Sequence, residues 1–198
     1  MDFMGRKRTI DREAVLDAAQ CVVQRDGVAR LTLDAVAAEA GISKASVLYD
    51  YKTKPALMRA LVERKIAAEE ERVGAIRAAL GETPNAVVRT RIAAATDPAT
   101  EDDQAFTLCL AAAMAQDSDL RKPICTTVGG AISEIQESSE SPNGALLAFL
   151  ALEGLKLMEY FGVYRFDAED RLQLLEEIGW LVDQTPGRVP LEAPAKVA

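Results

Sequence analysis

Apolar residues recur along the chain at i, i+3, i+4 and i+7, and no alternating pattern of useful length for a strand is found. Such stripes begin at Val15 and at Leu33, and they predict helices over residues 11–26 and 32–40. A glycine follows each stretch directly, at the position where this residue adopts the backbone that ends a helix. The pattern therefore predicts an all-α protein.

Capping residues predict where the next helices start. Ser43 would cap a short helix over residues 44–50, and Thr53 would cap a long helix over residues 54–80. Further helices are predicted over residues 84–95, 101–116, 118–138, 142–164 and 168–183, which gives about nine in all. Within residues 118–138, Pro123 and the Gly129–Gly130 pair predict a kink or a break.

The last two predicted helices are the most hydrophobic part of the chain. In residues 142–164 the apolar side chains cover more than one stripe, so this helix must bury two faces. The second face would either fill the core of the monomer or pair with the same face of a second subunit. The pattern alone leaves both interpretations open.

The composition narrows the class of protein. The chain has 198 residues, of which 49% are hydrophobic and 27% charged, which suits a folded protein with a core. No run approaches the length of a membrane helix and no secretory signal is recognisable, so we expect a cytoplasmic location and no membrane partner. There is no histidine, and the three cysteines are scattered without metal-ligand spacing. We therefore expect no enzyme, no metal and no cofactor.

The charge is unevenly distributed along the chain. Residues 1–54 carry nine Lys or Arg and eight Asp or Glu, whereas residues 55–198 carry fourteen and twenty-three. The net charge of −8 thus arises in the C-terminal part and does not argue against a local basic surface on the N-terminal part.

Three short helices with a tight turn before the third predict a helix-turn-helix domain over residues 1–54. In this motif the third helix enters the major groove of DNA, so its exposed face needs small or polar side chains. Lysines and hydroxyls around it would contact phosphates. The candidate DNA-binding residues are Thr32, Ser43, Lys44, Ala45, Ser46, Tyr49, Lys52 and Lys54. The basic segment Arg6-Lys7-Arg8 would either reach a minor groove or only improve solubility.

The segment from Thr9 to about Leu61 resembles the DNA-binding domain of the TetR family of transcriptional regulators. The resemblance is carried by Val36-Ala37-Ala38-Glu39-Ala40-Gly41-Ile42-Ser43-Lys44, Val47-Leu48-Tyr49-Asp50-Tyr51 and Lys52-Thr53-Lys54-Pro55-Ala56-Leu57. It implies an all-helical homodimer with a variable, ligand-sensing C-terminal domain. It also implies a four-helix dimer interface made by residues 142–164 and 168–183 of both subunits, which favours the second interpretation of the apolar face.

One position departs from the family pattern. The end of the third helix matches best the family members that have Val-Leu-Tyr-His-Phe, and Asp50 stands here in place of the histidine. A carboxylate near DNA phosphates is unfavourable unless it points inward or pairs with Lys52 or Lys54. A phosphate contact at position 50 is therefore in doubt.

The remaining chain is interpreted as a ligand-binding and dimerisation domain over residues 55–184, followed by a flexible tail over 185–198. Apolar, aromatic and sulfur side chains suit an adaptable pocket for a small molecule. The candidate ligand-binding residues are Phe106, Cys109, Leu110, Met114, Phe149, Glu153, Leu157 and Tyr160. Glu153 would either meet a cationic or hydrogen-bonding ligand or pair with Lys156, three residues later.

Two functions are compatible with these observations. The first is a DNA-binding regulator, most simply a repressor that a small molecule releases from a palindromic operator. The second is a helical dimeric protein that binds a small molecule and has no role on DNA. The acidic C-terminal part and Asp50 are the features that favour the second.

Overall fold

The computed structural model describes residues 11–187, and over this range the chain forms nine α-helices and one short 3₁₀ helix. They are α1 (Arg12–Asp26), η1 (Val28–Arg30), α2 (Leu33–Glu39), α3 (Lys44–Asp50), α4 (Lys54–Leu80), α5 (Ala86–Ala94), α6 (Glu101–Gln116), α7 (Ser118–Ser138), α8 (Pro142–Tyr160) and α9 (Ala168–Leu181). The all-α prediction is confirmed. The Arg6-Lys7-Arg8 segment and residues 188–198 of the predicted tail lie outside the described residues.

Side-chain caps explain most helix starts. The hydroxyls of Thr32, Ser43, Thr53 and Thr100 accept hydrogen bonds from backbone N–H groups in the first turns of α2, α3, α4 and α6. α8 ends at Tyr160, four residues before the predicted end, because the chain turns at Gly162 with a φ of 63°. A break in α7 is excluded, since one helix continues through Pro123 and Gly129–Gly130, and the alternative of a kink stays a prediction.

Two hydrophobic clusters divide the molecule. The first joins α1, α2, α3 and the start of α4, as far as Val62, with α6 and the start of α7. The second joins α5, α7, α8 and α9. α6 thus packs on the N-terminal helices with Phe106 and Leu110, although it begins about 50 residues after α3 ends. The helices of the C-terminal part are therefore tied directly to the N-terminal unit.

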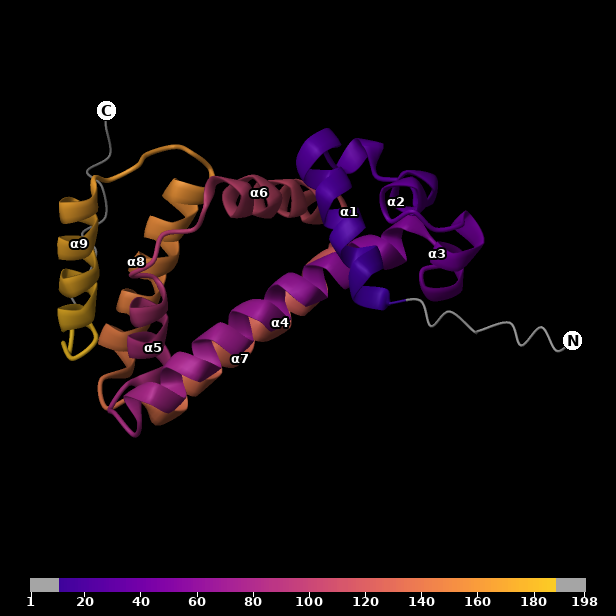
Figure 1. Cartoon of the computed structure of the whole chain (residues 1–198). Coiled ribbons are helices and arrows are strands. Elements are labelled where there is room, and N and C mark those ends of the chain that lie inside the picture. The colour runs from indigo at the N-terminus through magenta and orange to yellow at the C-terminus, as the bar shows by residue number, and fades with distance from the viewer. Residues whose placement is uncertain (1–10, 188–198) are drawn as a thin grey trace, which may run out of the picture.

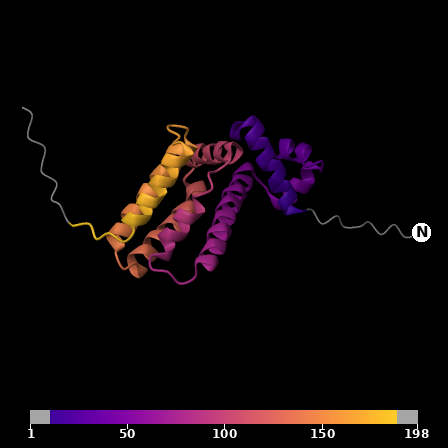
Figure 2. The ribbon, with the colours of Figure 1, turned by 60° about the vertical axis from the view of Figure 1, so that its left-hand side comes forward.

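The arrangement of the long helices places this unit at one end of the molecule (Figure 1). α4 leaves the N-terminal unit and runs beside α7, while α6 leads from the same unit toward α8. α9 lies against α8 at the opposite end, where its outer side faces away from the rest of the chain (Figure 2). The space between α4, α8 and α9 is where the site described below is formed.

A close approach between α8 and the end of α9 gives a first testable prediction. A Cβ at Gly144 would lie 2.0 Å from the backbone oxygen of Gln184 and 2.8 Å from that of Leu181. Gly144→Ala should therefore lower the free energy of unfolding by about 1–3 kcal/mol through overpacking. Gly74→Ala is the matched control, because its Cβ would meet no atom within 4 Å in the middle of α4.

Chemical denaturation of both variants checks this prediction. Gly74→Ala should raise stability by about 0.5–1 kcal/mol, the usual gain for alanine over glycine inside a helix. Equal effects of the two substitutions would contradict the close packing at Gly144.

Candidate nucleic-acid interface and ligand cleft

The helix-turn-helix is held together by buried apolar side chains and presents polar ones outward. Val36 of α2 and Val47 of α3 are both fully buried, which fixes the angle between the two helices. On the outer side of α3, Lys44 and Ala45 are exposed, and Tyr49 is 82% exposed. A large aromatic side chain so open to solvent contributes little to folding, so it is available for a partner.

Lys44 has a partner that the sequence did not reveal. Its Nζ lies 2.8 Å from Oδ2 of Asp34 in the first turn of α2, and both side chains are more than half exposed. The ion pair spans the turn between the two helices. Because an exposed pair of this kind contributes little to stability, Lys44 can exchange Asp34 for a phosphate or a base edge.

The other predicted DNA-binding residues are placed differently from one another. The Ser43 and Ser46 hydroxyls lie 2.8 Å apart at the start of α3, and the Thr32 hydroxyl is exposed at the start of α2. Lys52 is exposed after α3. Lys54 instead points inward, where its Nζ donates to the carbonyl oxygen of Val28 at 2.7 Å. Lys54 therefore ties the start of α4 to the turn after α1.

Asp50 turns one carboxylate oxygen away from solvent. Oδ2 is buried and has no hydrogen-bond partner among residues 11–187, and no ion pair joins it to Lys52 or Lys54 there. The inward orientation keeps part of the charge from a bound phosphate, at the cost of a buried oxygen without a donor.

The predicted ligand-binding residues do not form one pocket. Phe106 and Leu110 are buried in the first hydrophobic cluster, and Cys109 and Met114 pack against it. Phe149 is buried in the other hydrophobic cluster, formed by α5, α7, α8 and α9. The reason is that α6 turns its apolar face toward the N-terminal helices, so these side chains stabilise the fold and do not line a common cavity.

The remaining three candidates lie on α8. Leu157 is 51% exposed on the outer side of the helix. Glu153 accepts from Nζ of Lys156 at 3.0 Å, which is the intrahelical pair that was the alternative for this residue. Of the eight candidates, Tyr160 alone lines the cleft of about 330 Å³ described next, and Phe106 borders a smaller one of about 180 Å³.

A cleft of about 330 Å³ lies between α4, the segment before α6, α8 and α9. We call it the charged cleft, because acidic and basic side chains alternate around a floor of alanines and Pro98. It is lined by Lys65, Ala68, Glu69, Arg72, Ala94, Ala95, Asp97, Pro98, Ala99, Thr100, Asp103, Lys156, Glu159, Tyr160 and Arg171. Its volume suits a small molecule.

Ion pairs organise the walls of the charged cleft. Arg171, which is 7% exposed, binds both carboxylate oxygens of Glu159 at 2.6 and 3.3 Å. Arg72 binds both oxygens of Glu69 at 3.0 Å, and this hydrogen bonding raises the pKa of the Arg72 guanidinium. Burial raises the pKa of the Tyr160 hydroxyl above its ordinary value, so the phenol stays protonated at neutral pH.

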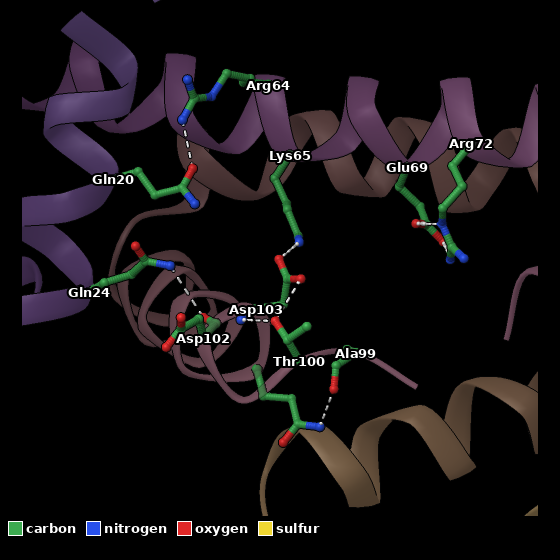
Figure 3. A network of polar contacts seen from close by, with 11 residues as sticks. Gln20, Gln24, Arg64, Lys65, Glu69, Arg72, Ala99, Thr100, Asp102 and Asp103 are labelled. Carbon is green, nitrogen blue, oxygen red and sulfur yellow. Dashed lines mark hydrogen bonds and ion pairs between the residues drawn. The ribbon is translucent and has the colours of Figure 1, made fainter. Parts of the chain in front are cut away.

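A polar network connects the charged cleft with the DNA-binding helices (Figure 3). Lys65 of α4 donates to Asp103 of α6 at 2.8 Å, and chiefly this hydrogen bond lowers the pKa of the Asp103 carboxyl. The pair therefore stabilises the fold above the ordinary carboxyl pKa and loses that contribution as the pH falls. The neighbouring Arg64 donates to Asp17 and Gln20 of α1 at 2.7 and 2.6 Å.

An apolar face remains uncovered on α8 and α9. Large apolar side chains follow each other at helical spacing on α8, and further ones lie on α9 and between the two helices. Those at least 45% exposed are Leu147, Leu150, Leu157, Met158, Phe161, Val163, Tyr164, Leu172 and Trp180. A Cβ at Gly154 or Gly179 would meet no atom within 4 Å. Within a single chain, none of the described residues covers this apolar surface.

Sequence reasoning missed the charged cleft because it searched for apolar positions. One signal was available, since Lys65, Glu69 and Arg72 are spaced at i, i+4 and i+7 and so share one face of α4. Arg171 and Glu159 gave no such signal, because they meet only through the packing of α8 against α9. None of the described helices is long and apolar enough to cross a membrane.

The family follows from two matches. The family model for bacterial regulatory proteins of the tetR family matches residues 15–61, and the model for the tetracyclin repressor-like C-terminal domain matches residues 85–183. The chain therefore belongs to the TetR family of transcriptional regulators. No curated protein sequence matches it.

Solved structures share this fold at low sequence identity. SCO7518 from Streptomyces coelicolor A3(2), described as a transcriptional regulator, is 20% identical at a TM-score of 0.64 over 87% of this chain and 98% of that chain. The multidrug binding protein EbrR, complexed with malachite green, is 21% identical at a TM-score of 0.66 over 85% and 98%. A regulator from Saccharomonospora viridis in complex with choline is 15% identical at 0.65 over 84% and 93%.

Proposed function

We propose that this protein is a ligand-responsive repressor that binds a palindromic operator as a homodimer and leaves it when a small molecule enters the charged cleft. The single observation that carries the proposal is the exposed face of α3, where Lys44, Ala45 and Tyr49 form a solvent-facing surface that contributes little to folding. Neighbouring structures that hold malachite green or choline support the small-molecule part.

The dimer would form through the uncovered apolar face of α8 and α9. A twofold axis brings the same patch of both subunits together, so every exposed apolar side chain finds an apolar partner. α8 and α9 lie at the end of the molecule away from α3, which leaves both recognition helices free for two half-sites of DNA.

The response would pass from the charged cleft to the DNA-binding helices through α4 and α6. Lys65 and Asp103 line the cleft, while Arg64 and Phe106 of the same two helices contact α1. A ligand that binds one orientation of α4 and α6 more tightly would shift the population toward it. The spacing of the two recognition helices would then no longer fit the operator.

Selection of bound fragments from the source genome tests the DNA-binding part. The full chain is incubated with sheared genomic DNA at physiological salt in the presence of competitor DNA. Recovery of a short palindrome supports a dimeric, sequence-specific regulator. Recovery of no sequence above background would contradict the proposal.

A second candidate is a dimeric small-molecule-binding protein without a role on DNA. Asp50 is the observation that favours it, because it puts a negative charge at the end of the proposed recognition helix, although one of its oxygens is turned inward. This candidate predicts ligand affinity together with no salt-dependent affinity for DNA.

Substitution of Asp50 gives a prediction that bears on both candidates. Asp50→Asn removes one negative charge and places an amide where Oδ2 now has no partner among the described residues. If DNA is the partner, affinity for it should rise about threefold to tenfold, because the repulsion of nearby phosphates is lost. Gel shift and fluorescence anisotropy at two salt concentrations measure the change.

Asp119→Asn on α7 is the matched control. Asp119 is exposed and pairs with Lys122 within its own helix, outside helices α1 to α3. The control should leave DNA affinity unchanged. A decrease in DNA affinity of Asp50→Asn would show that the carboxylate supports the interface and does not oppose it.

A further inference from the structure

The walls of the charged cleft differ in their remaining hydrogen-bonding capacity. Both oxygens of Glu69 accept from Arg72, and both oxygens of Glu159 accept from Arg171. Asp103 is held in the same way, with one oxygen bound by an ammonium and the other by a hydroxyl. Apart from the exposed Asp97, the acceptors of the lining carboxylates are therefore largely satisfied, and the two guanidinium groups are committed to them.

Donors, in contrast, are left over. Lys65 and Lys156 each have one hydrogen-bond partner within residues 11–187, Asp103 and Glu153, although an ammonium group has three donors. The Tyr160 hydroxyl also lines the cleft and has no partner in the described part of the chain. It is protonated at neutral pH, so it can donate. The three groups come from α4 and α8, and all three line the same cavity.

We propose that the ligand class of the charged cleft is a small monocarboxylate, held through its carboxylate by Lys65, Lys156 and Tyr160. This inference rests on the proposed function and names the chemistry of its ligand. A carboxylate consists of acceptors only, which complements a site with unused donors and occupied acceptors.

The size and polarity of the cleft limit the rest of the ligand. The floor is formed by small apolar side chains, namely Ala68, Ala94, Ala95, Pro98 and Ala99. Such a surface suits a short aliphatic or aromatic body. A single negative charge fits best, because each lysine is already shared with a carboxylate of the protein. Asp97 on the exposed side of the cleft adds a further negative charge there.

The same chemistry would connect binding to the response. A carboxylate bound by the unused donors of Lys65 shares the charge of the ammonium with Asp103, and so weakens the only ion pair that the described residues form between α4 and α6. α6 packs on α1 through Phe106, so a shift of α6 moves the DNA-binding helices.

Calorimetric titration of the full chain tests the ligand class with matched probes. Hexanoate and phenylacetate are compared with hexanamide and phenylacetamide, with hexylamine and phenethylamine, and with inorganic phosphate. The carboxylates should bind at least about tenfold more tightly than their amides, because a charge-assisted hydrogen bond is stronger than a neutral one. No binding by either carboxylate, equal binding of the amides, or tighter binding of an amine or of phosphate would overturn the proposal.

Substitutions locate the binding groups. Tyr160→Phe removes only the hydroxyl and should weaken phenylacetate binding about fivefold or more, as should Lys156→Gln. Lys122→Gln on α7 is the control, since this exposed lysine lies outside the cleft. Phenylacetate affinity unchanged in both Tyr160→Phe and Lys156→Gln would overturn the placement of the carboxylate.

The two proposals fail independently in these experiments. Titration of the ligand contains no DNA, and selection of genomic fragments contains no ligand. A protein that binds the palindrome but no carboxylate would refute only the ligand class. A protein that binds phenylacetate but no DNA would keep the cleft assignment and refute the repressor.

Discussion

The double variant Lys44→Ala, Tyr49→Ala should lose at least about 100-fold in affinity for the operator, since each side chain that reads DNA contributes on the order of 1–3 kcal/mol. Both subunits of a dimer carry the change, so the loss is felt at two half-sites. Thermal stability should change little, because Tyr49 is 82% exposed and the pair of Lys44 with Asp34 lies at the surface. Fluorescence anisotropy with the selected palindrome measures the affinity.

Lys122→Ala is the control for the loss of a lysine. Lys122 pairs with Asp119 at 2.6 Å, both side chains are exposed, and the residue lies on α7 outside the helix-turn-helix. Its removal should leave operator affinity and the dimer intact. If the double variant binds the palindrome as tightly as the unchanged protein, α3 is not the recognition helix.

The substitutions Leu150→Glu and Trp180→Glu should each convert the dimer into monomers. These side chains are 54% and 66% exposed in the single chain, so a charge there costs the monomer little. In the dimer the same charge would be buried twice against an apolar surface, at several kcal/mol. The dimer dissociation constant should therefore rise by at least about 100-fold, as sedimentation equilibrium at micromolar concentration would show.

Leu80→Glu separates this effect from a general response to surface charge. Leu80 is 43% exposed at the end of α4 and belongs to neither α8 nor α9. This variant should remain dimeric. Monomeric variants should also bind the operator more weakly, because the two half-sites are then no longer bound by one dimer. Persistence of the dimer in both Leu150→Glu and Trp180→Glu would place the interface elsewhere.

Capping residues and glycines made the helix bounds predictable, but these local signals do not predict features that depend on how the helices pack together. A capping hydroxyl or a terminal glycine acts on its own helix, so the bounds of α3, α4, α6 and α7 agree with the prediction. The end of α8 was misplaced because apolar residues continue past Gly162, and they read as further helix although the backbone turns there.

The interior of the C-terminal part was not predictable in the same way. Phe106 and Met114 were expected in a pocket on the basis of their chemistry, and they lie in or against the hydrophobic cluster of α1 and α4. Whether an apolar residue lines a cavity or fills a core depends on how its helix packs against the other helices. A single sequence does not reveal this packing. Charged residues such as Arg171 were overlooked, because its partner Glu159 is close only in the folded chain.

The contact of α6 with α1 has a consequence for how this protein could evolve. Phe106 and Leu110 complete the hydrophobic cluster of the helix-turn-helix, so the DNA-binding unit is not an interchangeable module. A fragment that ends after residue 61 would leave apolar surface of α1 without its cover. If relatives exchanged their C-terminal ligand-binding domains, the side chains of the incoming α6 would have to fit those of the resident α1. Recombination between such genes should therefore be tolerated only where α6 is inherited together with α1.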